Sequence, residues 1–363
     1  MDIKARPNVG TLAVYVPGKP IEEVQRELGL SEVIKLASNE NSWGPSPKAL
    51  EAGRQAMEKA FLYPDANAAG LKELVAAELE VGTDQIVTGN GSEEIIAMIA
   101  KAFVDPGDEV VMAKPSFPRY QTCVELMNGV AVEVELKDYR HDLEQMAQKI
   151  TARTKVIFVC NPNNPSGTIV SAQELDEFMA GVPEDVLVVF DEAYFEYVAD
   201  KNYASGLKYL HGGRNVLVLR TFAKAFGLAG LRMGFGIGTA QIVDFLNRVR
   251  EPFNGNLVAQ AAAAAAWQDK EYLAEIIAKN AKGLAELRSA LENLGCRVVP
   301  SHTNFVLVDV GKPSQEVFEA LLKQGIIVRP GHLFGYPTSL RVTVGTPEEN
   351  EAFLSALKKA LKQ

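Results

Sequence analysis

The segment TKVIFVCNPNNPSGTIVSAQELDEFMAGVPEDVLVVFD, residues 154–191, contains two short apolar runs separated by a helical pattern. The runs TKVIFVC (154–160) and DVLVVFD (185–191) are rich in β-branched residues, whereas SAQELDEFMAG (171–181) has the apolar spacing of an amphipathic helix. A strand, a helix and a second strand in this order are typical of a parallel sheet covered by helices. The segment therefore predicts an α/β fold with ligands at the carboxyl ends of its strands.

The same alternation extends in both directions. Further β-branched runs occupy residues 85–89, 108–113, 131–136, 215–221 and 233–238, with helical patterns between most of them. We expect a large domain over residues 41–268, with a mostly parallel seven-stranded sheet flanked by helices. After residue 269 a long charged helical pattern leads into short strands and helices. Residues 269–363 therefore predict a smaller α+β domain, which residues 1–40 join as an N-terminal arm.

The composition excludes several classes of protein. The chain is 47% hydrophobic and 23% charged, with a formal net charge of -9. An acidic chain with only short basic clusters argues against a nucleic-acid partner, and no apolar run approaches the roughly 20 residues of a membrane span. The 3 cysteines and 4 histidines have no metal-ligand spacing. We therefore expect no metal site, and the odd number of distant cysteines favours reduced thiols in a cytoplasmic protein.

Two polar residues follow neighbouring strands. In the loop NPNNPSGT (161–168), prolines and a glycine stop the strand, so that Asn164 can donate from its amide at the edge of the sheet. A plain Asn-Pro turn is the simpler interpretation of this loop alone. Asp191 ends the next apolar run, and a carboxylate at a dry strand end needs a cationic or hydrogen-bonding partner. A protonated ring nitrogen would serve, and a helix cap or a salt bridge is an equally good alternative.

One strand later, TFAKAFGLAGLR (221–232) places Lys224 in a loop of small residues. There the amine could be partly desolvated and nucleophilic, although a lone lysine is usually a solvated surface charge. The amide, the carboxylate with Tyr194 three residues on, and the lysine lie at consecutive strand ends. These are the groups that pyridoxal phosphate needs. Asn164 and Tyr194 would bond its ring oxygen, Asp191 would keep its ring nitrogen protonated, and Lys224 would form the Schiff base.

A phosphate site completes this hypothesis. Thr221 and Arg232 can bind phosphate through a hydroxyl and a guanidinium. In GNGSEEII (89–96), glycines lead into a helix whose amino terminus, near Ser92 and Glu93, offers backbone N–H groups to an anion. The motif lacks the third glycine of a dinucleotide fingerprint and the GK[ST] of a Walker loop.

With these motifs in order, the chain resembles the fold-type I pyridoxal-phosphate-dependent transferases of the aspartate aminotransferase superfamily, and within it most the histidinol-phosphate aminotransferases. The resemblance covers nearly the whole chain and is specific for the superfamily. It is less specific for substrate, because aromatic amino-acid aminotransferases and threonine-phosphate decarboxylases share much of it. The further motifs are YVPGKP (15–20), KLASNEN (35–41), YPD (63–65), PSFPRY (115–120), DEAY (191–194), RPG (329–331) and LRVTVGTPEEN (340–350).

The resemblance implies roles for further residues. Phe117 would stack on the cofactor ring, and Tyr63 would reach the phosphate of the cofactor in the partner subunit. Arg341 would hold the anionic end of the substrate, helped by Arg329 and by Tyr15 from the partner, which implies a homodimer with shared sites. The simpler alternatives are a core position for Phe117 and an ordinary ion pair for Arg329.

This chain departs from the family pattern at two places. Many members have a serine where this chain has Ala223, so Thr221 and Arg232 would carry more of the phosphate binding. The family usually reads NENP, whereas Ser42 and Trp43 follow NEN here and alter a loop near the substrate entrance.

The implied activity is transfer of an amino group from L-histidinol phosphate to 2-oxoglutarate, which gives imidazole acetol phosphate and L-glutamate in histidine biosynthesis. Two arginines suit a phosphate monoester better than a carboxylate. The alternatives are an aromatic amino-acid aminotransferase, a threonine-phosphate decarboxylase and a non-catalytic regulator that binds the cofactor. Such regulators usually carry a DNA-binding domain, for which residues 1–40 are too short and not basic.

Overall fold

The computed structural model describes residues 3–12, 14 and 18–362. Its largest sheet has seven strands in the order β2-β8-β7-β6-β5-β3-β4. Neighbours run parallel except at β8, which is antiparallel to β2 and β7. The predicted mostly parallel sheet is therefore confirmed. Its strands are β2 (Ile86–Gly89), β3 (Glu109–Lys114), β4 (Val130–Glu135), β5 (Thr154–Cys160), β6 (Leu187–Asp191), β7 (Val216–Thr221) and β8 (Gly234–Gly238).

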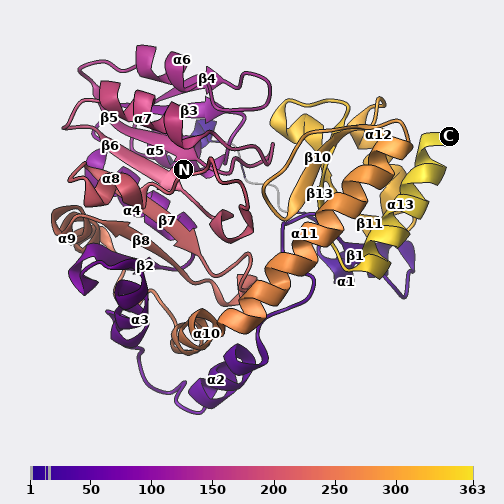
Figure 1. Ribbon diagram of the computed structural model, residues 1–363, viewed down its shortest axis with the longest axis horizontal. Coiled ribbons are helices and arrows are strands. Elements are labelled where there is room, and N and C mark those ends of the chain that lie inside the picture. Colours follow the sequence, from indigo (N-terminus) through magenta and orange to yellow (C-terminus); the bar gives the residue numbers. More distant parts are fainter. Residues whose placement is uncertain (1–2, 13, 15–17, 363) are drawn as a thin grey trace.

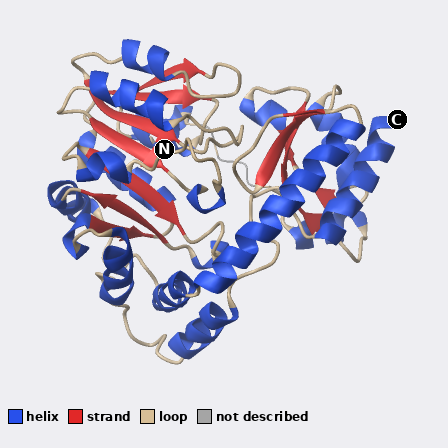
Figure 2. Ribbon diagram, in the orientation of Figure 1, coloured by secondary structure: helices blue, strands red, loops and turns tan. Residues whose placement is uncertain are grey.

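Helices cover both faces of this sheet (Figures 1 and 2). Successive side chains of a strand point to opposite faces, so Ile157 and Val159 of β5 enter one core and Val156 and Phe158 enter the other. The first core contains α2 (Pro47–Met57), α3 (Ala69–Leu79), α6 (Leu143–Gln148), α7 (Ala172–Gly181), α8 (Leu207–His211) and α10 (Leu257–Gln268). The second contains α4 (Ser92–Phe103), α5 (Arg119–Leu126) and α9 (Ala240–Val249).

A smaller α+β unit follows. Its antiparallel sheet has the order β12-β13-β10-β9, and a parallel pair, β1 and β11, lies in the same unit. The strands are β1 (Ile34–Lys35), β9 (Arg297–Val298), β10 (Phe305–Asp309), β11 (Ile326–Ile327), β12 (Arg329–Pro330) and β13 (Ser339–Thr343). The helices are α1 (Ile21–Leu28), α11 (Lys270–Asn293), α12 (Ser314–Leu322) and α13 (Pro347–Lys362).

The long helix α11 connects the two units. It begins next to α10 and runs across to the smaller sheet (Figure 1). Its last turns place Leu287 and Leu291 in the core of the smaller unit, with strands β10 and β13 and helices α12 and α13. The charged pattern that predicted a helix leaving the sheet is thus one continuous helix.

The N-terminal arm contacts both units. Its short 3-10 helix η1 (Pro7–Thr11) lies at the end of α5, where Asn8 donates to the carbonyls of Glu125 and Leu126 at 2.9 Å. Further on, β1 pairs with β11 of the smaller unit. We propose residues 41–268 as one domain and residues 1–40 with 269–363 as the other, with η1 lying on the first.

Candidate active site

Three polar residues predicted from the sequence lie at the carboxyl ends of adjacent strands. Asn164 follows β5, Asp191 ends β6, and Lys224 lies three residues beyond the end of β7. Cys160, the last residue of β5, is paired with Asp191. Because β5, β6 and β7 are parallel, these ends meet at one edge of the sheet. The structure therefore brings the amide, the carboxylate and the amine to the same edge.

The Asp191 carboxylate is buried, with an exposed fraction of 4%. The Tyr120 hydroxyl donates to its Oδ2 at 2.6 Å, and the backbone N–H of Ala193 donates to its Oδ1 at 3.2 Å. Burial raises the pKa of this carboxyl above its ordinary value, although the Tyr120 hydrogen bond opposes the rise. A buried carboxylate in this setting is stabilised by a nearby cation. A protonated ring nitrogen would supply that charge.

Lys224 is partly buried, and its Nζ donates to the carbonyl oxygen of Ser38 at 3.2 Å. The same nitrogen lies 5.6 Å from the centre of the Tyr194 ring. Burial, together with the positive charges of Arg341 and Arg232, lowers the pKa of the Lys224 amine to about 8. A large part of the amine is therefore neutral near pH 8, and the neutral amine is the form that attacks a carbonyl carbon.

The residues predicted to bind phosphate lie near the start of α4. Gly91 precedes this helix with a φ of 80°, and a Cβ there would stand 2.9 Å from Nη2 of Arg232. The guanidinium of Arg232 thus lies against the helix amino terminus at Ser92, and both favour negative charge. Thr221 is buried nearby, and its hydroxyl accepts from the backbone N–H of Ala223 at 3.1 Å. Ala223 thus takes part in this contact through its backbone alone.

The loop before α5 is tied to the start of α4. Arg119 Nε lies 2.7 Å from Glu93 Oε1, so the Glu93 side chain forms an ion pair and its backbone N–H remains the group that could face an anion. Phe117 is partly buried and packs edge-on against Tyr120, with ring centres 5.6 Å apart. Tyr120 also donates to Asp191, so its ring connects Phe117 with the buried carboxylate.

Two arginines extend the site into the smaller sheet. Arg329 of β12 and Arg341 of β13 are directly opposite each other in an antiparallel pair, so their side chains share one face. Arg341 donates to Asn164 Oδ1 at 2.6 Å and to the carbonyl of Ala37 at 2.7 Å. Like charges in this arrangement repel. A bound anion would therefore stabilise the pair.

Tyr63, which the resemblance assigns to the phosphate site of the partner subunit, does not join this cluster in the described chain. Tyr63 is 81% exposed and stacks on Phe253, with ring centres 4.6 Å apart. A contact with the phosphate site would have to be made from a second subunit, as the resemblance implies. Tyr15 lies outside the described residues.

The segment Ala37–Asn39 was missed as a site element. Its Ala37 and Ser38 carbonyls accept from Arg341 and Lys224, and the Asn39 amide donates to the Tyr194 hydroxyl at 2.9 Å. The motif KLASNEN contains these residues, but it has no strand or helix periodicity that would place them. The only local signal was the pair of asparagines, Asn39 and Asn41.

Tyr120 was also missed, because it lies inside the motif PSFPRY without a spacing that points to Asp191. The departure at Trp43 has a structural explanation. Trp43 packs against the hydrophobic core of the smaller unit, and its carbonyl accepts from the Tyr272 hydroxyl at 3.2 Å. Trp43 thus anchors the loop after NEN to helix α11.

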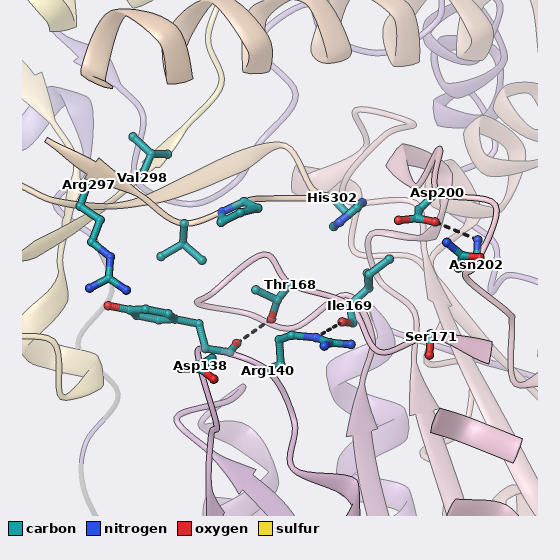
Figure 3. Close-up of a pocket in the computed structure, with 13 residues that line it drawn as sticks. Asp138, Arg140, Thr168, Ile169, Ser171, Asp200, Asn202, Arg297, Val298 and His302 are labelled. Atoms are coloured by element: carbon teal, nitrogen blue, oxygen red, sulfur yellow. Dashed lines mark hydrogen bonds between the residues drawn. The ribbon is translucent and has the colours of Figure 1, made fainter. Parts of the chain in front are cut away.

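A separate cavity of about 450 Å³ lies between the loop at residues 138–140 and the segment 297–302 (Figure 3). None of the predicted site residues lines it. Its wall carries both charges, since Arg140 and Arg297 are accompanied by Asp138 and Asp200. The cavity therefore has no clear preference for an anion or a cation.

Within residues 3–12, 14 and 18–362, no group of histidine, cysteine and acidic side chains is arranged to hold a metal ion. None of the helices described there is long and apolar enough to cross a membrane.

The sequence profile of the family "Aminotransferase class I and II" matches residues 31–357. The histidinol-phosphate aminotransferase of Moorella thermoacetica is 51% identical over 99% of this chain and 93% of its own length. The enzyme of the same name from Caldicellulosiruptor saccharolyticus is 48% identical over 97% of this chain and 99% of its own length.

The fold has a similar solved relative. The crystal structure of histidinol-phosphate aminotransferase from Sinorhizobium meliloti, in complex with pyridoxal-5'-phosphate, superimposes with a TM-score of 0.92 at 28% identity. The match covers 100% of this chain and 98% of that one. Taken together with the profile match over most of its length, this similarity shows that the chain belongs to the aminotransferase class I and II family.

Proposed function

We propose that this protein is a pyridoxal-phosphate-dependent aminotransferase that transfers the amino group of L-histidinol phosphate to 2-oxoglutarate in histidine biosynthesis. The products are imidazole acetol phosphate and L-glutamate. Relatives named histidinol-phosphate aminotransferase, 45–51% identical over nearly the whole chain, support this assignment. The observation that carries it is the placement of Arg341, which donates to Asn164 Oδ1 and lies directly opposite Arg329 in the smaller sheet.

The residues at the strand ends fit the cofactor. Lys224 would form the covalent link to its aldehyde, and Asp191 would bond its ring nitrogen. Tyr194 and Asn164 would donate to its ring oxygen. The Asn164 Oδ1 already accepts from Arg341, and among the described residues no acceptor is recorded for the Asn164 amide hydrogens. These hydrogens are therefore available to a ligand.

The phosphate of the cofactor would lie at the start of α4. The backbone N–H groups at Ser92 and Glu93, the Thr221 hydroxyl and the Arg232 guanidinium would hold it. A side chain at Gly91 would fill this space and meet Arg232, which supports the need for glycine there. Phe117 would stack on the cofactor ring.

The bound cofactor supplies an electron sink for the carbanion formed at the amino-bearing carbon. The chain supplies the proton transfers. Because its pKa is lowered to about 8, Lys224 Nζ can both hold and release a proton near neutral pH. Asp191 would hold the ring nitrogen of the bound cofactor and stabilise its protonated form.

The arginine pair supports a phosphorylated substrate. A phosphate monoester carries close to two negative charges at neutral pH, and a guanidinium can bind its oxygens through two parallel hydrogen bonds. An α-carboxylate needs only one such group. Arg341 and Arg329 together therefore favour L-histidinol phosphate over an aromatic amino acid.

A homodimer with shared sites is part of the proposal. A group of apolar side chains is exposed on α2, in the residues that follow it and at Phe253, which stacks on Tyr63, and its exposure is best explained by a covering subunit. Tyr63 belongs to this group and would reach the cofactor phosphate of the partner, while Tyr15 would reach the partner's substrate. The exposed group is Leu50, Met57, Phe61, Leu62, Tyr63 and Phe253. An active monomer in analytical ultracentrifugation at assay concentration would contradict this assembly.

The redox state of the cysteines supports a cytoplasmic location. Cys123, Cys160 and Cys296 are buried and form no disulfide. Burial raises the pKa of the Cys160 thiol to about 12, so that it stays protonated and unreactive. Reduced thiols of this kind are typical of a reducing compartment.

The test uses the absorption spectrum of the purified protein loaded with pyridoxal phosphate and no oxo-acid acceptor. Addition of L-histidinol phosphate should remove the visible band of the bound cofactor within one turnover, and L-phenylalanine should act much more slowly. Faster loss with L-phenylalanine would assign the protein to the aromatic aminotransferases. Release of carbon dioxide with a phosphorylated amino acid would indicate a decarboxylase, and no change with any donor would indicate a regulator.

A further inference from the structure

The hydroxyl of Tyr194 has one described hydrogen-bond partner, the side-chain amide of Asn39. Asn39 Nδ2 lies 2.9 Å from the Tyr194 oxygen. Both side chains are buried, with exposed fractions of 1% and 3%. An amide nitrogen can only donate, so the phenol oxygen is the acceptor in this bond.

The orientation of the Asn39 amide follows from its other contact. Its Oδ1 accepts from the Thr343 hydroxyl at 3.4 Å, which leaves Nδ2 as the atom that faces Tyr194. A phenol has a single hydrogen. Because the bond from Asn39 occupies the oxygen as an acceptor, that hydrogen must point away from Asn39. Among the described residues no acceptor is recorded for it.

Asn39 is itself firmly held. Its backbone has a φ of 56°, a conformation that asparagine tolerates better than most residues. Its N–H donates to Thr343 Oγ1 at 3.0 Å, and its carbonyl accepts from Asn304 Nδ2 at 3.0 Å. Thr343 and Asn304 belong to the smaller unit, at β13 and just before β10. The smaller unit therefore holds Asn39 in place, whereas Tyr194 follows β6 of the larger unit.

The Tyr194 ring is fixed as well. It packs edge-on against Phe305, with ring centres 5.3 Å apart, and Lys224 Nζ lies 5.6 Å from its centre. A fixed ring with a fixed acceptor bond leaves one free direction for the hydroxyl hydrogen, on the side away from Asn39.

We propose that Asn39 is a positioning residue that makes the Tyr194 hydroxyl a donor toward the ring oxygen of the cofactor. This inference rests on the proposed function, in which Tyr194 bonds that oxygen. Asn39 does not touch the reacting atoms and acts through Tyr194. By stabilising negative charge on the ring oxygen, the directed hydrogen lowers the proton affinity of the nitrogen that joins Lys224 to the cofactor.

The test measures the pH midpoint at which the visible absorption of the enzyme-bound cofactor changes. Asn39→Gly removes the amide and keeps a residue that adopts positive φ without strain. The midpoint should rise by about one pH unit, which is the size expected when one hydrogen bond to a charged group is lost. Asn41→Ala is the matched control, because Asn41 donates to the carbonyls of Gly44 and Ala225 rather than to Tyr194. Its midpoint should stay at the wild-type value.

A double-mutant cycle separates this role from a purely structural one. In a Tyr194→Phe background, Asn39→Gly should leave the midpoint unchanged, even if it lowers the melting temperature of the apo-protein. An unchanged midpoint in the single Asn39→Gly variant, or an equal shift in both backgrounds, would overturn the inference. If the wild-type protein forms no visible band with pyridoxal phosphate, the proposed function has failed instead, and the two failures are thereby distinguished.

Discussion

Charged side chains are arranged differently at the carboxyl edge of the large sheet and at the arginine pair of the smaller sheet. At the edge, the side chains of Asp191 and Lys224 are partly or wholly buried and form hydrogen bonds with neutral groups. On the smaller sheet, Arg329 and Arg341 place two like charges side by side. Burial tunes the proton affinity of a reactive group, whereas adjacent like charges concentrate potential for an anion. We propose on this basis that the two units divide chemistry and substrate recognition between them.

We expect the largest effect from a substitution that removes the reactive amine and leaves the arginine pair intact. Lys224→Ala should lower turnover by about four orders of magnitude or more, because it removes both the covalent link and the proton carrier. Binding of L-histidinol phosphate, measured by calorimetry, should change much less, since the arginine pair is intact. Lys358→Ala, an exposed position on α13, is the matched control and should keep full activity. Substantial turnover in the Lys224 variant would rule out its assigned role.

Substitutions in the arginine pair should reduce activity less than the loss of Lys224 does. Arg329→Met should raise the KM for L-histidinol phosphate by about 10- to 100-fold, the range for a lost charge-assisted hydrogen bond, with little change in kcat. Arg341→Met should raise KM and also lower kcat, because Arg341 orients Asn164. Steady-state kinetics with L-phenylalanine supplies the contrast. If Arg329→Met affects both substrates equally, the pair does not select a phosphate.

The phosphate site of the cofactor can be disturbed without touching either charge pair. Gly91→Ala puts a Cβ against Arg232 at a positive φ, and should weaken pyridoxal phosphate binding by about tenfold. Gly70→Ala in α3 is the control, because nothing lies within 4 Å of its added Cβ. Fluorescence titration of the apo-protein measures the affinity. A Gly91 variant with wild-type affinity would place the phosphate elsewhere.

We expect the smallest effect from the charge of Arg341 in the smaller unit on the pKa of Lys224 in the larger one. Because the pKa of Lys224 is lowered to about 8, the neutral amine increases about tenfold per pH unit below 8 and levels off above it. The rate of cofactor attachment to the apo-protein should follow this curve. Arg341→Met removes a positive charge that lowers this pKa, so the midpoint should move to higher pH by a fraction of a unit. A midpoint near the ordinary lysine value in the wild type would show that Lys224 is not desolvated.

Much of the large sheet could be predicted from the sequence because its strands are buried on both faces. Runs such as 154–160 and 185–191 are therefore almost wholly apolar, and β5 and β6 lie within them. The order of the strands in the sheet could not be read in the same way. The antiparallel strand β8 is inserted between β2 and β7, and no feature of MGFGIG distinguishes it from a parallel strand.

Some residues of the candidate site could likewise be predicted from the sequence, and others could not. Asn164, Asp191 and Lys224 were predictable because each follows a strand, and parallel strands bring their ends together whatever the rest of the chain does. Asn39 and Tyr120 were not, since each acts through a contact with a residue far away in the sequence, Tyr194 and Asp191. Their neighbours in the chain carry no sign of that contact.

The sequence by itself determined the α/β class, the polar residues at the strand ends and the glycine at the start of α4, because local periodicity and backbone conformation depend on neighbouring residues. Only the tertiary structure decided which donors surround Asp191, how far the pKa of Lys224 falls, and that Arg329 stands opposite Arg341. Burial, strand register and hydrogen-bond direction arise when distant segments pack together. The segment Ala37–Asn39 shows this most clearly, since three residues without regular structure contact Arg341, Lys224 and Tyr194 only in the folded chain.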